Sequence, residues 1–154
     1  MDWQSVINNP ILKDLPFKIE LNQWGKIVMS PASNYHGNLQ FEVATVIKEG
    51  KRGSGKIIME CSIQTNQGVK VADVAWASDL FIQEHGFDTP YKKSPEICVE
   101  IISPSNTQGE MTEKIALYLA KGAHEVWIVR EEGKIAYYTS EGEIACSKEL
   151  SVSL

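Results

Sequence analysis

The segments VKVADVAWA (69–77) and PEICVEIISPS (95–105), followed by TQGEMTEKIALYLAKG (107–122), set the architecture of this chain. The first two have the apolar content of buried strands, and the third has the three-and-four spacing of apolar residues that is typical of an amphipathic helix. The apolar runs 69–77 and 97–102 within these segments nevertheless contain one acidic residue each, Asp73 and Glu100. Because an unpaired charge in a buried strand is costly, we expect an ion or a cationic partner beside both acids.

Together with Lys114 on the predicted helix, the two acids predict a site for one divalent cation. Asp73 and Glu100 supply the hard oxygen ligands that Mg²⁺ prefers, and the helix after the Glu100 strand would bring Lys114 beside them. Such an ion lowers the pKa of a bound water and neutralises negative charge that develops on a phosphate. Taken singly, each residue has a simpler interpretation: Asp73 could cap a loop, and Lys114 could lie along the apolar surface with its ammonium in water.

An N-terminal β-hairpin is predicted upstream of these segments. Residues 17–21 alternate apolar and polar side chains, as a half-buried strand does, and residues 26–29 would form the return strand. A short helix over residues 2–8 would precede the hairpin. A longer helix would run from Ser33 or Asn34 to about residue 49.

The glycine-rich loop over residues 50–56 resembles a phosphate-binding P-loop in its spacing. Ile57 stands where that motif requires Ser or Thr, and the loop leads from a helix into a strand, which reverses the required order. We therefore interpret it as a mobile loop. The remaining predicted elements are strands at 57–59, 63–65, 126–129 and 135–138, an irregular connection at 78–94, and a polar tail from 144.

Composition restricts the class of protein. A chain of 154 residues with 43% hydrophobic residues fits one domain, 1–154, with a core of its own. No long apolar run predicts a membrane span, and the N-terminus lacks the pattern of a signal peptide, so the cytoplasm is the expected location. Cys61, Cys98 and Cys146 are too few and too far apart for a disulfide framework or a metal knuckle, and each is predicted to be a small buried hydrophobe.

The order of Asp, then Glu in an apolar strand, then Lys resembles the PD-(D/E)XK nuclease superfamily. More closely, the chain resembles the Uma-two-type family of restriction endonucleases. The most specific of the matching blocks are Glu-x-x-Ser-Pro-Ser and Lys-x-x-x-Tyr-x-x-x-Gly. The matching positions are 15–21, 29–31, 36–37, 71–74, 99–105, 114, 117–118, 122 and 125–127.

This sequence departs from the superfamily pattern in three places. Ile102 stands where the superfamily has its lysine, two residues after the glutamate, and Lys114 on the helix matches the displaced lysine of the family. Ala72 replaces a proline that is usual before the aspartate. Arg130 replaces an aspartate that is common after the strand with the tryptophan.

The resemblance implies a restriction-endonuclease-like α/β fold, with a mixed central β-sheet flanked by helices. It implies Mg²⁺-dependent hydrolysis of DNA phosphodiester bonds, with Mn²⁺ able to substitute. Asp73 and Glu100 carry over as metal ligands and catalytic residues, the backbone carbonyl of Ile101 as a third ligand, and Lys114 as a catalytic residue. An enzyme that cuts both DNA strands usually needs two sites, so a homodimer is expected.

Three further residues are weaker candidates. His36 matches a family position at the start of the long helix, where it could touch the substrate or the metal, although a histidine there is more often structural. Glu20 and Glu60 could each approach the metal from an adjacent strand.

Two other classes of protein compete with the nuclease. A catalytically silent nucleic-acid-binding or assembly module could retain the fold, and the net charge of −5 favours it because nucleases often carry a basic face. A small-molecule hydrolase could use the same carboxylates, and would have a closed pocket too narrow for a duplex.

Overall fold

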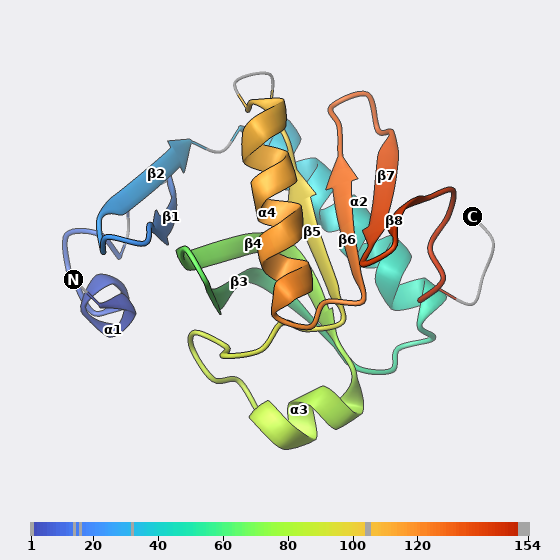
Figure 1. Cartoon of the computed structure of the whole chain (residues 1–154), viewed down its shortest axis with the longest axis horizontal. Coiled ribbons are helices and arrows are strands. Elements are labelled where there is room, and N and C mark those ends of the chain that lie inside the picture. Colours follow the sequence, from blue (N-terminus) through green and yellow to red (C-terminus); the bar gives the residue numbers. More distant parts are fainter. Residues whose placement is uncertain (1, 14, 16, 32, 104–105, 151–154) are drawn as a thin grey trace.

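A six-stranded mixed sheet forms the body of the molecule, and a separate two-stranded hairpin stands beside it (Figure 1). The computed structural model describes residues 2–13, 15, 17–31, 33–103 and 106–150, without the side chain of Pro31. Pro104 and Ser105 of the Glu-x-x-Ser-Pro-Ser block lie outside these residues. In spatial order the sheet consists of β3 (Lys56–Thr65), β4 (Gly68–Ala77), β5 (Ile97–Ile101), β6 (Glu125–Val129), β7 (Ile135–Thr139) and β8 (Gly142–Ile144).

The parallel pair in the centre of the sheet explains why a helix follows β5. β5 and β6 pair in parallel, whereas all other neighbours in this sheet are antiparallel. A parallel pair needs a crossover connection, which here contains α4 (Gln108–Ala120). The side chain of Thr107 caps this helix by accepting the N–H of Glu110, and Gly122 follows its end with a φ of +107°.

Helices cover both faces of β5, so the strand is buried throughout. On one face, α4 packs Met111 and Tyr118 against a core that contains Cys98. On the other face, α2 (Asn34–Gly50) packs against a core that contains Val99 (Figure 1). Adjacent residues of a strand point to opposite faces, which accounts for the near-continuous apolar run that the sequence shows around Glu100.

The N-terminal hairpin consists of β1 (Phe17–Leu21) and β2 (Ile27–Pro31), which pair antiparallel. α1 (Trp3–Ile7), capped by Asp2, packs with this hairpin and the start of β4 in a small core of its own. Gly68 allows the close approach, because a Cβ there would lie 2.3 Å from the carbonyl oxygen of Leu21 and its φ is +91°. The hairpin is therefore attached to the sheet at the end of β1.

The structure corrects several local predictions. Residues 57–59 and 63–65 belong to one strand, β3, and the ladder between β3 and β4 keeps one register on both sides of Glu60. Glu60 itself is not paired and has a φ of +52°. The connection predicted as irregular contains α3 (Asp79–His85), which is too short to show a helical period. Cys146 is exposed, whereas Cys61 and Cys98 are buried as predicted.

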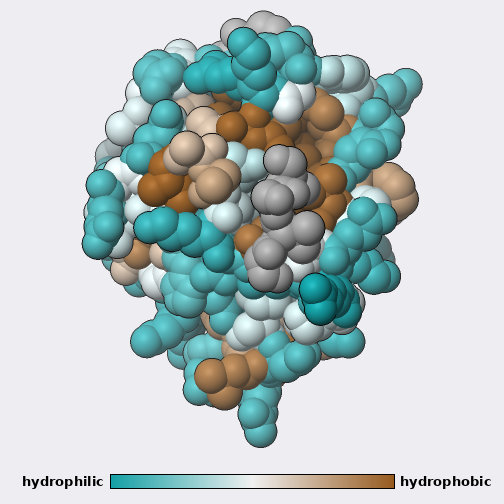
Figure 2. All heavy atoms as spheres, turned by 90° about the vertical axis from the view of Figure 1, so that its right-hand side faces the viewer, coloured by the Kyte–Doolittle hydropathy of each residue, from teal (hydrophilic) through white to brown (hydrophobic). Residues whose placement is uncertain are grey.

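The C-terminal tail is anchored rather than free along its described part. The buried carboxylate of Glu125 accepts hydrogen bonds from the hydroxyl of Ser147 and from the backbone N–H groups of Lys148 and Glu149. Figure 2 looks onto the end of the molecule where α2, β7 and β8 lie, and shows apolar side chains gathered within a hydrophilic surround. None of the described helices is long and apolar enough to cross a membrane.

Candidate active site

Asp73 and Glu100 lie beside each other where the ladder between β4 and β5 ends. The last pair of that ladder is Val74 with Val99, and the same register places Asp73 next to Glu100. Oδ2 of Asp73 accepts a hydrogen bond of 2.7 Å from the backbone N–H of Ile101, which continues the connection between the strands. The two side chains are only 1% and 3% exposed, so both carboxylates depend on protein partners for their charge.

Lys18 of β1 supplies a cation that touches both carboxylates. Its Nζ lies 3.2 Å from Oδ1 of Asp73 and 2.9 Å from Oε2 of Glu100. Burial opposes the charge on Lys18, but the negative charges of Glu100, Asp73 and Glu20 hold its pKa well above the ordinary value. Burial also opposes the charge on Asp73, yet Lys18 lowers the pKa of this carboxyl below its usual range.

Lys114 of α4 forms a second ion-pair link, between Glu20 and Glu100. Its Nζ lies 2.9 Å from Oε2 of Glu20 and 3.4 Å from Oε1 of Glu100. Oε2 of Glu20 also accepts the backbone N–H of Val71 at 2.7 Å, which fixes the carboxylate against β4. Against the effect of burial, the charges of Lys114 and Lys18 lower the pKa of Glu20. Lys114 thus contacts two acids instead of extending into water.

Tyr118 lies one helical turn after Lys114 and points to the same place. Its hydroxyl donates a hydrogen bond of 2.7 Å to Oε1 of Glu100. Glu100 therefore has three donors, from β1 and from two positions of α4, although it is fully buried in β5. Burial raises the pKa of Glu100 against the lowering effects of Lys114 and Lys18.

The start of α2 also contacts Asp73. Nε2 of His36 lies 3.2 Å from Oδ1 of Asp73, and this hydrogen bond raises the pKa of the imidazole. Gln40, one turn later, donates to the backbone carbonyl of Asp73 and to Oε1 of Glu60. Glu60, exposed on β3, is thereby held near the site without contacting Glu100 or either lysine through a hydrogen bond in the described part of the chain.

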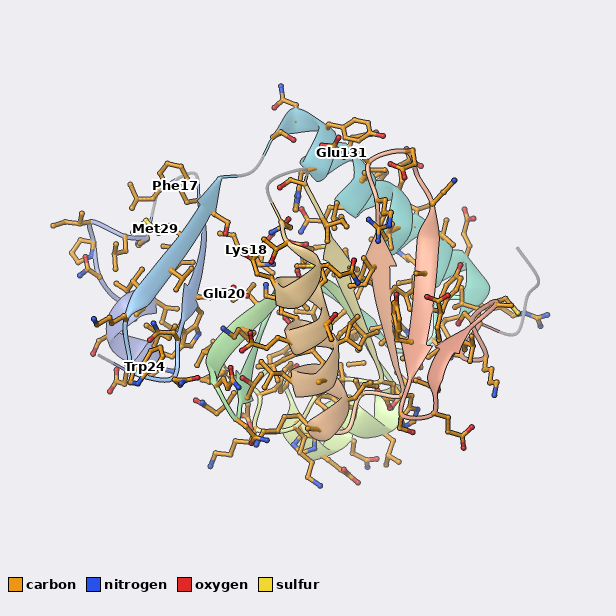
Figure 3. The ribbon with its side chains drawn as sticks, turned by 45° about the horizontal axis from the view of Figure 1, so that its top comes forward. Phe17, Lys18, Glu20, Trp24, Met29 and Glu131 are labelled. Carbon is orange, nitrogen blue, oxygen red and sulfur yellow. The ribbon has the colours of Figure 1, made fainter. Side chains whose placement is uncertain are left out.

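A cavity of about 1060 Å³ lies between the hairpin and the main sheet, and its lining includes Lys18, Glu20, Asp73, Glu100 and Lys114. Lys18 and Glu20 both enter it because residues two apart on a strand point to the same face. Figure 3 shows the two side chains extending from the hairpin toward the main sheet, while Phe17 and Met29 lie on the other side of the hairpin. Charged side chains from β1, β3, β4, β5 and α4 line the cavity.

The structure brings together the three residues that the sequence singled out, Asp73, Glu100 and Lys114, and also draws in the weaker candidates His36 and Glu20. Asp73 lies inside β4, so it does not cap a loop at a strand end. Ile101 contacts Asp73 through its N–H, and the metal-binding role of its carbonyl stays a prediction.

Lys18 was not predicted to be a site residue. A signal for it was present, because Lys18 and Glu20 alternate with apolar residues in the first strand and must share its polar face. Glu20 was predicted as a weaker candidate for approaching the metal, but Lys18 on the same face was not, since nothing in the sequence indicates that the hairpin folds against the ends of β4 and β5.

The donor set fits one hard divalent cation. Among the residues that the structure describes, no group of three or more His, Cys, Asp or Glu side chains could hold a metal ion. Mg²⁺ needs fewer, because it keeps several waters and is often held by one or two carboxylates. The ammonium of Lys18 already touches Asp73 and Glu100 at once, so both carboxylates face a single cation position.

Comparisons with known proteins show the family and the fold of this chain. The family model of Uma2, described as "Putative restriction endonuclease", matches residues 12–151. This chain belongs to the Uma2 family. The fold of this Uma2 protein is also similar to the crystal structure of a "putative nuclease" from Anabaena variabilis ATCC 29413. That match has a TM-score of 0.68 at 20% sequence identity and covers 81% of this chain and 73% of the other.

A comparison with curated proteins finds no match. The similarity to the Anabaena structure shows the fold alone at this identity. It confirms the predicted nuclease-like α/β architecture, and the family model confirms the predicted family. The roles of individual Uma2 residues in this chain rest on the geometry described above.

Proposed function

We propose that this Uma2 protein is a Mg²⁺-dependent endonuclease that hydrolyses DNA phosphodiester bonds, with Mn²⁺ able to substitute. One observation carries the proposal. Two buried carboxylates, Asp73 and Glu100, share one cation in a cavity, and a second lysine, Lys114, lies beside them. Acids that can hold a metal ion, with a lysine beside them, are suited to neutralising the negative charge that develops on a phosphate.

Asp73 and Glu100 would hold the metal ion, with the carbonyl of Ile101 as an additional ligand. When bound, the ion supplies charge neutralisation at the phosphate and a more acidic water. His36 and the N–H of Ile101 orient the two oxygens of Asp73, and Tyr118 orients Glu100. These neighbours act as positioning residues for the carboxylates.

Lys114 would contact a non-bridging oxygen of the scissile phosphate or the attacking water. Glu20 holds this lysine at the cavity by an ion pair of 2.9 Å, and its carboxylate is itself fixed by the N–H of Val71. Glu20 is accordingly proposed to be a positioning residue, and the approach of Glu20 or Glu60 to the metal is not part of this proposal.

The acidic balance of the chain limits how DNA would bind. A net charge of −5 gives no broad attraction to phosphates, so binding depends on the local lysines and the divalent ion. We further propose that the enzyme acts as a homodimer, which would present two sites to the two strands.

Single substitutions test this function. Asp73→Ala and Glu100→Ala should abolish Mn²⁺ binding measured by calorimetry, because each removes half of the carboxylate pair. Lys114→Ala should retain metal binding and lose cleavage of plasmid and oligonucleotide DNA by about 10²–10³-fold, the range for loss of one donor to a developing anion. Lys26→Ala, on the turn of the same hairpin but exposed, is the matched control and should cleave normally.

A silent nucleic-acid-binding module is the second candidate. The internal ion pairs of Lys18 and Lys114 favour it, because they neutralise the acids without any metal. A wild-type protein that binds DNA but cleaves neither double-stranded nor single-stranded substrates with Mg²⁺ or Mn²⁺ would establish this candidate. Unchanged Mn²⁺ affinity in both carboxylate variants would remove the assignment of the metal site itself.

A further inference from the structure

Lys18 stands at the position that a metal ion would need. Asp73 is contacted by Lys18 and His36, and Glu100 by Lys18 and Lys114. Of the cations in the described part of the chain, Lys18 alone contacts both carboxylates. Its ammonium therefore marks the point that is shared by the two acids.

An ammonium and a divalent ion cannot both occupy that point. Like charges held side by side in a buried place repel strongly, since little water screens them. The oxygens are also committed, because Oδ2 of Asp73 accepts the N–H of Ile101 and Oε1 of Glu100 accepts the hydroxyl of Tyr118. Of the remaining oxygens, Oε2 of Glu100 contacts Lys18, and Oδ1 of Asp73 contacts both Lys18 and His36.

The side chain of Lys18 can leave while its backbone stays. The end of β1 is fixed to β4 by the hydrogen bond between Glu20 and Val71 and by the close approach of the Leu21 carbonyl to Gly68. A lysine has a flexible four-carbon stem, and Lys18 borders the cavity of about 1060 Å³. A change of rotamer therefore suffices to move the ammonium from the carboxylates into the cavity.

We propose that Lys18 is an internal counter-ion that competes with the divalent cation for Asp73 and Glu100. Metal binding displaces its ammonium into the cavity, where it pairs with a phosphate oxygen of the substrate. This inference rests on the proposed metal-dependent function, and it adds a role that the pattern of Asp, Glu and Lys does not contain. Before metal binds, Lys18 keeps the two buried acids together. Afterwards it becomes a second cationic contact for the phosphate beside Lys114.

Calorimetric titration with Mn²⁺ tests the competition. Lys18→Met keeps the length of the stem and removes the charge, so the affinity for Mn²⁺ should rise by about tenfold or more. Lys26→Met removes a charge from the exposed turn of the same hairpin and should change the affinity less than about twofold. Lys114→Met removes a charge near Glu100 alone, and its gain in affinity should be clearly smaller than that of Lys18→Met.

Equal or weaker Mn²⁺ binding by Lys18→Met, or an equal gain in Lys114→Met, would overturn the inference. So would the absence of Mn²⁺ binding in all variants. If Lys18→Met does not fold, crystals of the wild-type protein soaked in Mn²⁺ decide the matter. An ion between Asp73 and Glu100 with Lys18 Nζ moved into the cavity supports displacement, and Nζ still on both carboxylates refutes it.

The inference and the proposed function fail separately. If the wild-type protein cleaves no DNA while Lys18→Met binds Mn²⁺ more tightly, the endonuclease function is rejected and the counter-ion role of Lys18 is supported. If the wild-type protein cleaves DNA but Lys18 Nζ stays on both carboxylates in Mn²⁺-soaked crystals, the function is supported and the counter-ion role is rejected.

Discussion

At the scale of single residues, Glu100 shows how a charge is accommodated inside a sheet. It lies in a strand that is buried throughout, yet its oxygens receive hydrogen bonds from a hydroxyl and two ammonium groups. Removing one partner of a buried charge costs more than the pair contributes, because the charge that remains is left without compensation. Each donor to Glu100 should therefore affect stability as well as the chemistry of the site.

Tyr118→Phe tests the neutral donor. The ring packing is retained and only the hydrogen bond of 2.7 Å to Glu100 is lost, so the free energy of unfolding should fall by about 1–3 kcal/mol. Urea unfolding followed by circular dichroism measures this change. Tyr137→Phe is the control, since Tyr137 is also buried and its hydroxyl makes no hydrogen bond within the described residues. Equal losses in the two variants would show that Glu100 does not depend on Tyr118.

At the scale of elements, the joint between the hairpin and β4 decides whether the site exists. β1 supplies Lys18 and Glu20, but it belongs to a different sheet from Asp73 and Glu100. Its position depends on the close approach of Leu21 to Gly68 and on a small core around Trp3. Weakening that attachment should separate Lys18 and Glu20 from Asp73, Glu100 and Lys114.

Gly68→Ala should weaken the joint. The new Cβ would lie 2.3 Å from the carbonyl oxygen of Leu21, so β1 must shift in addition to the strain of a positive φ. Gly133→Ala is matched to it, because Gly133 has a similar φ of +85° and nothing within 4 Å of a Cβ. The free energy of unfolding should fall by about 1 kcal/mol in Gly133→Ala, because of the backbone conformation alone. It should fall by about 1–3 kcal/mol more in Gly68→Ala, because of the added clash.

Urea unfolding of both variants measures the difference, and calorimetry with Mn²⁺ shows whether the site moves with the hairpin. Equal stability of the two variants would mean that the hairpin adapts without cost. In that case its attachment would not position Lys18.

The elements that were predicted correctly are those whose sequence reflects local physics. β5 and α4 carry a buried apolar run and a helical period, and Thr107 and Gly122 mark the ends of the helix. α3 was missed because one buried residue in seven gives no period. Lys18 was missed for a different reason: its partner acids lie on other strands, and only the docking of the hairpin brings them together.

At the scale of the whole molecule, the acidic net charge restricts how the proposed enzyme would bind DNA. The chain carries 15 basic and 20 acidic residues, so most of its surface should repel a phosphate backbone. Affinity would then come from a few contacts in one cavity. Such binding releases few counter-ions and differs in its salt dependence from that of a protein with a basic face.

The salt dependence of DNA binding measures how many phosphates are contacted. We expect log K to fall with log salt at a slope of magnitude about 2–3, consistent with two or three neutralised phosphates. Fluorescence anisotropy of a labelled oligonucleotide between low and moderate KCl gives the slope. Lys114→Ala should reduce its magnitude by about 1. A slope as steep as that of a protein with many phosphate contacts would indicate a second, basic surface.

A dimer would explain how an enzyme with one active site per chain cleaves both strands of DNA. Size-exclusion chromatography with light scattering should give twice the mass of the 17.2 kDa chain if the predicted homodimer forms. A monomer that still cleaves DNA would act on one strand at a time and should produce nicked circles from a plasmid before linear molecules.

The interruption of β3 at Glu60 bears on the solubility of this sheet. β3 is an outer strand ten residues long, and a free strand of that length is a template for the growth of fibrils from neighbouring copies. Glu60 breaks the regular backbone with its φ of +52°, and Tyr91 bonds the backbone of residues 62 and 64 farther along. Only the short segment from Lys56 to Met59 is left for an incoming chain, so the break in the strand at Glu60 also discourages aggregation.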